Sequence, residues 1–353
     1  MVYSERLKGY DFGWGHPFRA DRYVNFMKLF REKVGDSEIF EVVEPREATE
    51  QELLLVHSQE YIDFIQTASR RLWAPSYRFL SPDTPLQPGM GEAARLVVGA
   101  SLLAGELVWE GKFNCAVGVG GGLHHARSSY GAGFCIYNDV AICIKNLLGK
   151  YNLERILVLD TDAHAGDGTA EIFYQDPRIL FIDLHQDPRT LYPGRGFAHE
   201  MGTGEGEGFT VNVPLPPGAS CKAYSYALKE IFTPLALEFR PQLIIRNGGS
   251  DPHFTDELTN LGLTVEGLRD ITRLVKQVAD EVCGGKVVDL IGSGYNAKVL
   301  PYGWLALVLG LSGLELELGE PFFFSLNEDA GLEETRRTVK GLKKRLSEFW
   351  KCF

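Results

Sequence analysis

The sequence predicts an α/β fold of three layers, in which a mainly parallel central sheet carries helices on both faces. Two observations support this fold class. Short apolar, β-branched runs recur along the chain, as in buried parallel strands. Segments with helical periodicity or helix-start signals separate most of these runs, and such alternation is typical of a parallel sheet covered on both sides. The chain shows no internal repeat, no low-complexity segment and no convincing linker, so we expect one domain over residues 1–353.

In the first half of the chain, turn residues and capping signals mark the expected elements. Thr49 and Glu52 have the spacing of a capping box, which predicts a helix starting there. His57 lies on that helix or at its end, and we expect it to be structural. Four prolines indicate a loop over residues 70–92. The other expected elements are helices over 23–33 and 91–109 and strands over 39–43 and 113–119.

In the second half, strands and helices alternate regularly. Residues 186–208 interrupt the alternation with a segment rich in Gly and Pro, which we expect to be a long loop. The expected strands are 155–160, 179–184, 210–213, 242–246 and 286–291. The expected helices are 136–148, one starting at 169–174, 222–239, 265–282, 297–309 and 333–350.

Composition excludes several classes of function. The 36 Lys and Arg residues against 47 Asp and Glu give a net charge of −11, which argues against a general nucleic-acid or anionic-membrane binder. The longest apolar run, residues 304–311, is too short to span a bilayer. Six scattered cysteines without a C-x-x-C pair and the lack of an apolar signal core predict a cytoplasmic protein with reduced thiols. No feature of the sequence favours a particular oligomeric state.

The stretch after residues 155–160 concentrates acidic groups where a strand ends. Asp160, Asp162 and His164 alternate, so in an extended segment they share one face. Ligands of open α/β sheets bind beyond the carboxyl ends of the strands. Crowded negative charge needs a compensating cation, and Asp oxygen and His nitrogen are both competent zinc ligands. The stretch therefore predicts a divalent metal site.

Three further strand ends carry polar side chains. His124 and His125 follow the glycines at 120–122, Asp251 follows the strand over 242–246, and Tyr295 follows the strand over 286–291. Each side chain alone would be an ordinary cap or core residue. The tandem histidines together with the Asp-x-Asp-x-His pattern have no such explanation, because all these groups would need partners inside the sheet.

In combination, these motifs resemble the histone deacetylase family, which includes acetoin-utilisation-type and acetylpolyamine amidohydrolase relatives. The resemblance runs from about residue 14 to 318 and implies an arginase/deacetylase-like fold with a single deacetylase-like catalytic domain. In chain order, the motifs are Gly122-Leu123-His124-His125-Ala126, Gly133-Phe134-Cys135-Ile136-Tyr137-Asn138-Asp139, Asp160-Thr161-Asp162-Ala163-His164-Ala165-Gly166-Asp167-Gly168-Thr169, Leu184-His185-Gln186, Tyr192-Pro193-Gly194, Gly249-Ser250-Asp251 and Gly292-Ser293-Gly294-Tyr295-Asn296.

The resemblance implies a role for each site residue. The metal ligands would be Asp162, His164 and Asp251, and the catalytic groups His124 held by Asp160, His125 held by Asp167, and Tyr295, whose hydroxyl binds the substrate carbonyl. The substrate residues would be Gly133, Phe134 and Tyr192 along a narrow acyl-lysine channel and Asp83 at its rim. Leu258 falls where some polyamine-selective relatives carry a Glu, which weakens a polyamine assignment.

The implied reaction is hydrolysis of an acetyl or short acyl amide, on a lysine side chain in a protein or on a small acetylated amine. A metal with three protein ligands activates water and polarises the carbonyl, a His accepts the proton, and a Tyr hydroxyl stabilises the oxyanion. Zn²⁺ is the expected ion, and the oxygen-rich ligand set leaves Fe²⁺ or Mn²⁺ open. The family also suggests a structural K⁺ near Asp160, Asp162 and His164.

Several positions depart from the family pattern. Asp183 stands where Ser is common, which bears on the K⁺ site, and Ala165 replaces a frequent second His. The turn before Tyr295 has fewer glycines than in many relatives. His253, two residues after Asp251, is expected to be structural, with a role near the substrate as the alternative.

Three other functions remain open. An acetylpolyamine deacetylase would use the same centre. An arginase-like ureohydrolase with two manganese ions shares the architecture, but its Asp-x-His-x-Asp spacing is absent, since His164 and Asp167 are three residues apart. A non-catalytic binding module is disfavoured, because every residue of the expected centre is present.

Overall fold

The computed structural model describes residues 1–35, 37–70, 79–322 and 327–353, and a six-stranded sheet forms its centre. Every pair of neighbouring strands is parallel, in the order β1-β6-β5-β2-β3-β4. The strands are β1 (Cys115–Val119), β2 (Ile156–Asp160), β3 (Ile179–Gln186), β4 (Thr210–Leu215), β5 (Leu243–Gly248) and β6 (Val287–Ile291). The predicted parallel sheet is confirmed.

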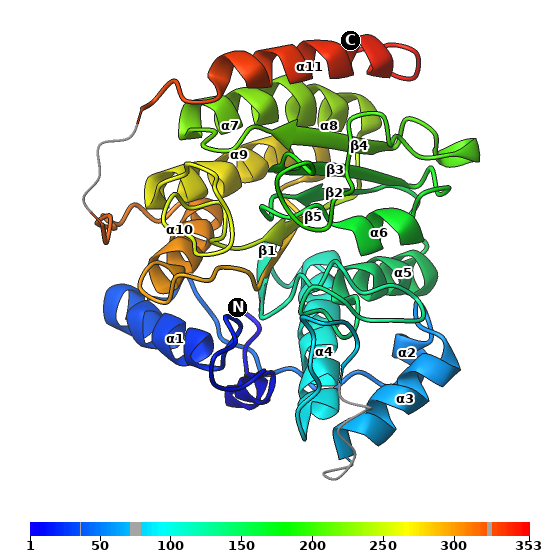
Figure 1. The fold of residues 1–353 in the computed structure, drawn as a ribbon, viewed down its shortest axis with the longest axis vertical. Coiled ribbons are helices and arrows are strands. Elements are labelled where there is room, and N and C mark those ends of the chain that lie inside the picture. The colour runs from blue at the N-terminus through cyan, green and yellow to red at the C-terminus, as the bar shows by residue number, and fades with distance from the viewer. Residues whose placement is uncertain (36, 71–78, 323–326) are drawn as a thin grey trace.

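Helices connect and cover the strands (Figure 1). They are α1 (Asp21–Val34), α2 (Glu50–Leu53), α3 (Gln59–Arg70), α4 (Met90–Trp109), α5 (Asp139–Tyr151), α6 (Asp167–Ile172), α7 (Cys221–Ala227), α8 (Thr233–Phe239), α9 (Val265–Cys283), α10 (Leu300–Ser312) and α11 (Leu332–Leu346). Shorter segments are η1 (Glu5–Gly9) and η3 (Gly204–Gly206), both 3₁₀-helical, and η4 (Leu228–Phe232), which is π-helical.

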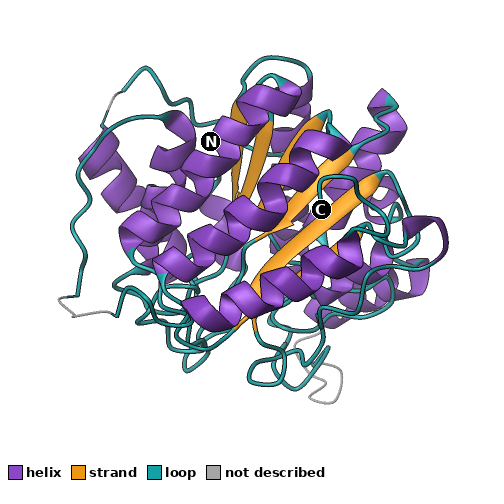
Figure 2. Ribbon diagram, turned by 90° about the horizontal axis from the view of Figure 1, so that it is seen from above, coloured by secondary structure: helices purple, strands orange, loops and turns teal. Residues whose placement is uncertain are grey.

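The sheet separates two apolar cores. Leu157 and Leu159 of β2 point into the core that contains residues of α9 and α10. Ile156 and Val158 point the other way, into the core that contains residues of α4 and α5. Figure 2 shows the strands enclosed between helices on both sides. The predicted three layers follow from this alternation, because successive side chains of a strand point to opposite faces.

One predicted strand is wrong. Residues 39–43 form no strand and contribute only an isolated bridge between Val43 and Val2. Ile39 is 58% exposed and Val42 49% exposed, so this β-branched segment runs over the surface instead of entering the sheet. Pro45 follows two residues after Val43, and proline cannot donate a hydrogen bond to a neighbouring strand.

Some helices begin or end elsewhere than predicted. The capping box of Thr49 and Glu52 is present, but α2 has only four residues, and His57 lies in the turn before α3. The helix predicted from residue 136 begins at Asp139, because the Asn138 side chain caps it by accepting from the Ala141 N–H. The helix predicted over 222–239 is divided into α7, η4 and α8. Of the predicted loop over 70–92, residues 71–78 with Pro75 lie outside the described residues.

No helix in the described parts of the chain is both long and apolar enough to cross a bilayer. All six cysteines are free thiols.

Candidate active site

The site lies where four neighbouring strands end. Because β1, β6, β5 and β2 are adjacent and parallel, the segments that follow them meet at one edge of the sheet. They bring together Asp162 and His164 after β2, His125 after β1, Asp251 after β5 and Tyr295 after β6. A small cavity of about 20 Å³ is lined by all of these residues except Asp251.

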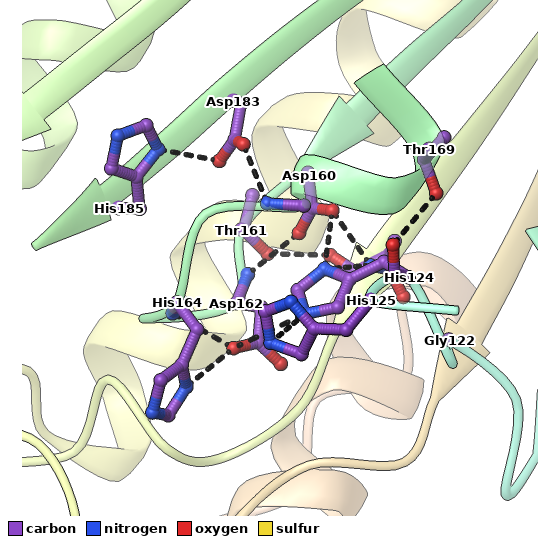
Figure 3. Close-up of polar contacts among 12 residues, drawn as sticks. Gly122, His124, His125, Asp160, Thr161, Asp162, His164, Thr169, Asp183 and His185 are labelled. Carbon is purple, nitrogen blue, oxygen red and sulfur yellow. Dashed lines mark hydrogen bonds and ion pairs between the residues drawn. The ribbon is translucent and has the colours of Figure 1, made fainter. Parts of the chain in front are cut away.

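Asp162, His164 and Asp251 form a group with the geometry of a metal site. One ligand atom from each lies within 4.8 Å of the others, and all three side chains are buried. No other group of three His, Cys, Asp or Glu side chains in the described residues approaches as closely. His164 Nδ1 lies 3.0 Å from Asp162 Oδ1 (Figure 3). The same nitrogen lies 3.2 Å from Asp251 Oδ2. The donor set of two carboxylates and one imidazole fits a divalent cation such as zinc.

Local hydrogen bonds orient the carboxylates. The Ser293 hydroxyl donates to Asp251 Oδ1 at 2.6 Å, and the Ala163 N–H donates to Asp251 Oδ2 at 3.1 Å. The His164 N–H donates to Asp162 Oδ1 at 2.9 Å. Burial and the facing Asp162 carboxylate raise the pKa of Asp251 well above its usual range. Two carboxylates this close inside a protein are stabilised by a shared proton or by a cation between them.

The tandem histidines are each held by a carboxylate. Asp160 Oδ2 lies 2.8 Å from His124 Nδ1, and Asp167 Oδ1 lies 2.7 Å from His125 Nδ1. The two Nε2 atoms are 3.1 Å apart, and Figure 3 shows both rings beside Asp162. The predicted pairing of each histidine with its aspartate is thus present in the geometry.

The surroundings shift the pKa values of the two imidazoles in opposite directions. Burial alone would lower the pKa of His124, but the carboxylates of Asp160 and Asp162 outweigh it and raise the pKa to about 10. Burial, together with the charge of His124, lowers the pKa of His125. Burial also opposes ionisation of Asp167, but donors from His125 and Arg127 lower the pKa of its carboxyl to about 2.

Aromatic rings enclose the centre. The ring of Tyr295 lies 6.3 Å from that of His164 and 5.7 Å from that of Phe134, between centroids. The ring of Tyr192 lies 5.0 Å from that of His125. Gly133 has φ = 57°, and a Cβ there would lie 2.4 Å from the His125 ring, so only glycine fits. The predicted channel residues Gly133, Phe134 and Tyr192 therefore do lie against the centre.

Asp83 and Leu258 lie further out. Asp83 accepts from the Gly133 N–H at 3.3 Å and from the Thr84 hydroxyl at 2.9 Å, so it is fastened to the channel segment. Leu258 is 36% exposed and is not one of the residues that line the small cavity. Its N–H donates to Asp256, whose carboxylate also accepts from the Tyr295 N–H.

The structure identifies supporting residues that the sequence analysis missed. Arg127 donates to Asp167 at 2.5 Å and to Glu171 at 2.8 Å. Asn247 donates to Asp160 Oδ2 at 2.8 Å. Arg127 directly follows a predicted motif and Asn247 directly follows a predicted strand, so position along the chain was the available signal. Arg22 is buried and donates to the carbonyl of Gly292, close to the turn that carries Tyr295.

Two residues that depart from the family pattern, His253 and Asp183, have hydrogen-bond partners in the structure. His253 is buried, with Nε2 2.9 Å from Glu320 and Nδ1 3.0 Å from the Thr255 hydroxyl, as a structural histidine would be. The Asp183 carboxylate accepts from the Gly166 N–H at 2.8 Å and lies 2.8 Å from His185 Nδ1.

The fold and the site define an α/β protein in which an Asp-His-Asp group lies beside carboxylate-paired histidines at the sheet edge. A family model described as "Histone deacetylase domain" matches residues 16–311. The chain is 36% identical to the "Probable deacetylase" of Archaeoglobus fulgidus, over 100% of this chain and 99% of that protein. It is also 36% identical to the "Acetoin utilization protein AcuC" of Bacillus subtilis, over 89% of this chain and 82% of that protein.

A solved structure, "Crystal Structure of HDA15 HD domain", superposes with a TM-score of 0.86. It is 28% identical in sequence, and the match covers 99% of this chain and 96% of that chain. The chain therefore belongs to the histone deacetylase domain family. Membership of this family, together with the deacetylase relatives, supports a deacetylase activity.

Proposed function

We propose that this protein is a zinc-dependent amidohydrolase that removes an acetyl or other short acyl group from an amine. The observation that carries the proposal is the position of two carboxylate-paired histidines beside the buried group of Asp162, His164 and Asp251. His124 Nε2 lies 4.0 Å from Asp162 Oδ1. The substrate would be N-acetyl-lysine in a protein or a small acetylated amine.

In this proposal Asp162, His164 and Asp251 hold the metal, with Fe²⁺ or Mn²⁺ as alternatives to zinc. A cation held there supplies a Lewis acid that activates water and polarises the amide carbonyl. The carboxylates of Asp160 and Asp167 orient the histidines through Nδ1, so both Nε2 atoms face the reaction centre. His125 Nε2 accepts the proton of the attacking water, and the histidine pair returns a proton to the departing amine. Tyr295 donates to the oxyanion.

The remaining residues select the substrate. Phe134 and Tyr192 form apolar walls for a methylene chain, and Gly133 keeps the passage narrow. Asp83, fastened to Gly133, accepts hydrogen bonds from the substrate at the rim. An apolar, partly exposed Leu258 offers no partner to a distant ammonium, which favours acyl-lysine over an acetylpolyamine.

Two other assignments belong to the same proposal. The single compact Asp-His-Asp group among the described residues favours one divalent ion, against the two of a ureohydrolase. A structural K⁺ near Asp160, Asp162 and His164 remains a prediction. Both oxygens of the Asp183 carboxylate already have partners other than K⁺, namely the Gly166 N–H and His185 Nδ1.

Turnover of an acetyl-lysine fluorogenic peptide tests the proposal. We expect His125→Ala to lose roughly 10²–10⁴-fold in rate and Tyr295→Phe roughly 10²–10³-fold, with metal still bound. The exposed His199 gives a matched control, since His199→Ala should keep the rate. Wild-type rates in both site variants would contradict the mechanism.

Metal analysis tests the ligands separately. We expect about one divalent ion per chain and its loss in Asp162→Ala. Undiminished metal in that variant would contradict the ligand assignment, and two ions per chain would favour the ureohydrolase. A substrate series of acetyl-lysine peptides, acetylpolyamines and longer acyl-lysines then identifies the acyl donor.

A further inference from the structure

A second cavity, of about 500 Å³, lies beside the proposed catalytic centre and takes no part in the proposed function. Residues of α6, β3, β4 and the loop over 186–208 line it. Asp167 is the only residue of the two histidine–aspartate pairs in its wall. Ala165 also lines it. The volume is in the range of small-molecule sites.

The floor of this cavity is part of a polar row across the sheet. Asn247, Asp160, Asp183 and Asn212 are aligned in register on β5, β2, β3 and β4, so their side chains share one face. Figure 3 shows Asp183 and Asp160 side by side, with Asp183 away from the histidine pair. Asp183 and Asn212 reach the cavity, and Thr210, two residues before Asn212, points the same way.

Two oxygen atoms of the floor accept no hydrogen bond from the described residues. Thr210 is 2% exposed, and within the described residues its hydroxyl has no hydrogen-bond partner. Asn212 is 3% exposed and donates its amide hydrogen to the Glu200 carbonyl at 2.8 Å. Its side-chain oxygen meets no donor from the described part of the chain. Both residues line the cavity, so these two oxygen atoms are open to a ligand that donates hydrogen bonds.

The charge of the wall points to a cation. Four carboxylates line the cavity, those of Asp167, Glu171, Asp183 and Glu200, and Arg195 is the only basic side chain among the lining residues. Arg127 pairs with Asp167 and Glu171 from behind, and His185 Nδ1 lies 2.8 Å from Asp183. Glu200 is thus the lining carboxylate that forms no ion pair with a described residue. Arg195 is exposed at the mouth and forms no ion pair with any described residue.

The spacing of these carboxylates excludes a compact metal site. No three of them bring ligand atoms within 4.8 Å of one another, whereas Asp162, His164 and Asp251 do. A charge spread over a cavity of this volume suits an extended organic cation with several N–H donors. We propose that the cavity binds a small aliphatic diamine, whose ammonium groups donate to Thr210 and Asn212 on the floor and face Glu171 in the wall.

Calorimetric titration of the full-length, metal-loaded chain with 1,4-diaminobutane tests this site. We expect saturable binding, and weakening of roughly tenfold or more in both Thr210→Val and Glu171→Gln, since each removes one hydrogen bond or charge contact. Glu205→Gln is the matched control, because Glu205 is an exposed carboxylate nearby that does not line the cavity. Its affinity should equal that of the unaltered chain.

Two further titrations separate this cavity from the metal centre and test whether charge is recognised. Asp162→Ala should bind the diamine as before, so loss of binding there would place the ligand at the metal centre and overturn the proposal. The neutral 1,4-butanediol should bind at least roughly tenfold more weakly if charge is recognised. Equal affinity for the diol, equal affinity in all variants, competition by K⁺ at equal concentration, or no saturation would each overturn the site. None of these readouts depends on turnover, so the result is separate from that of the proposed function.

Discussion

Asp167 receives two donors from the segment that follows β1, His125 at 2.7 Å and Arg127 at 2.5 Å. The carboxylate is buried, and its two oxygens are divided between the imidazole and the guanidinium. Arg127 also contacts Glu171, so it fixes Asp167 relative to the rest of α6. The orientation of the His125 ring therefore depends on a residue that need not touch the substrate.

Removing the Arg127 guanidinium should reduce turnover without removing metal. In Arg127→Met, Asp167 keeps only the His125 contact, and we expect a loss of roughly 10–100-fold in kcat, as for other partners that orient a ligand or base. Arg178→Met is a suitable control, because Arg178 pairs with Asp176 at the surface. An unchanged kcat with normal metal content would show that the guanidinium does not position the histidine.

Most of the expected site could be predicted from the sequence because its residues follow apolar strands directly. Asp162, His164, Asp251 and Tyr295 are polar groups at points where a buried strand ends, and parallel strands place such points together. Arg127 was not predicted, because an arginine in a polar segment looks like a surface residue until its partner, 40 residues away, is known.

At the scale of elements, the turn between α2 and α3 is joined to the site by one histidine. His57 Nδ1 lies 3.0 Å from the Arg127 carbonyl, and His57 Nε2 accepts from the Asn138 N–H at 3.0 Å. Protonating Nε2 would place two donors against each other. Burial lowers the pKa of His57 to about 4, which makes this turn sensitive to acid.

The effect of His57 on stability should depend on pH. Between about pH 6.5 and pH 4 the unfolded chain binds a proton on this imidazole and the folded chain does not, so stability falls as the pH falls. His57→Gln should be less stable by about 1–3 kcal/mol near pH 7, and the difference should narrow by up to about 1.4 kcal/mol per pH unit below about pH 6.5. Urea unfolding at about pH 7 and about pH 5.5 measures both. A constant difference would contradict the lowered pKa.

Helix α4 packs closely against an extended segment through a glycine. A Cβ at Gly99 would lie 1.7 Å from the Arg46 carbonyl oxygen, so the backbones of the two segments touch there. We expect Gly99→Ala to destabilise the protein by about 1–3 kcal/mol or more, because the overlap forces the segments apart. Gly149 in α5 has no atom within 4 Å of its Cβ position, and Gly149→Ala should stabilise by up to about 1 kcal/mol. Equal midpoints of chemical unfolding for both variants would contradict the packing.

The elements were predictable to different degrees for physical reasons. The six strands of the sheet are buried on both faces, and such strands are recognisable as continuous apolar runs. Residues 39–43 have the same composition, but composition does not reveal whether a partner strand is available. The start of α5 depends on the Asn138 cap, which hydrophobic periodicity does not record.

At the scale of the whole molecule, metal binding should contribute to stability. The folded chain brings two carboxylates and an imidazole together, and the unfolded chain does not, so a divalent ion stabilises by about 2.7 kcal/mol at a hundredfold excess over its Kd. Chelation should lower the Tm by several degrees, and added Zn²⁺ should restore it. Asp162→Ala is expected to show neither change. The same response in that variant would place the stabilising ion elsewhere.

The strand order also places the proposed catalytic centre and the acidic cavity over different parts of the sheet. The proposed catalytic groups follow β1, β6, β5 and β2, whereas the acidic cavity lies over β3 and β4. Only Asp167 belongs to both. Substitutions along β4 and in the loop over 186–208, apart from Tyr192 beside His125, can therefore accumulate without displacing a metal ligand. Descendants of this chain can then acquire or lose a second specificity while the proposed hydrolytic centre is retained. The same division would allow a regulatory ligand site to be engineered in the cavity while the proposed catalytic residues stay unchanged.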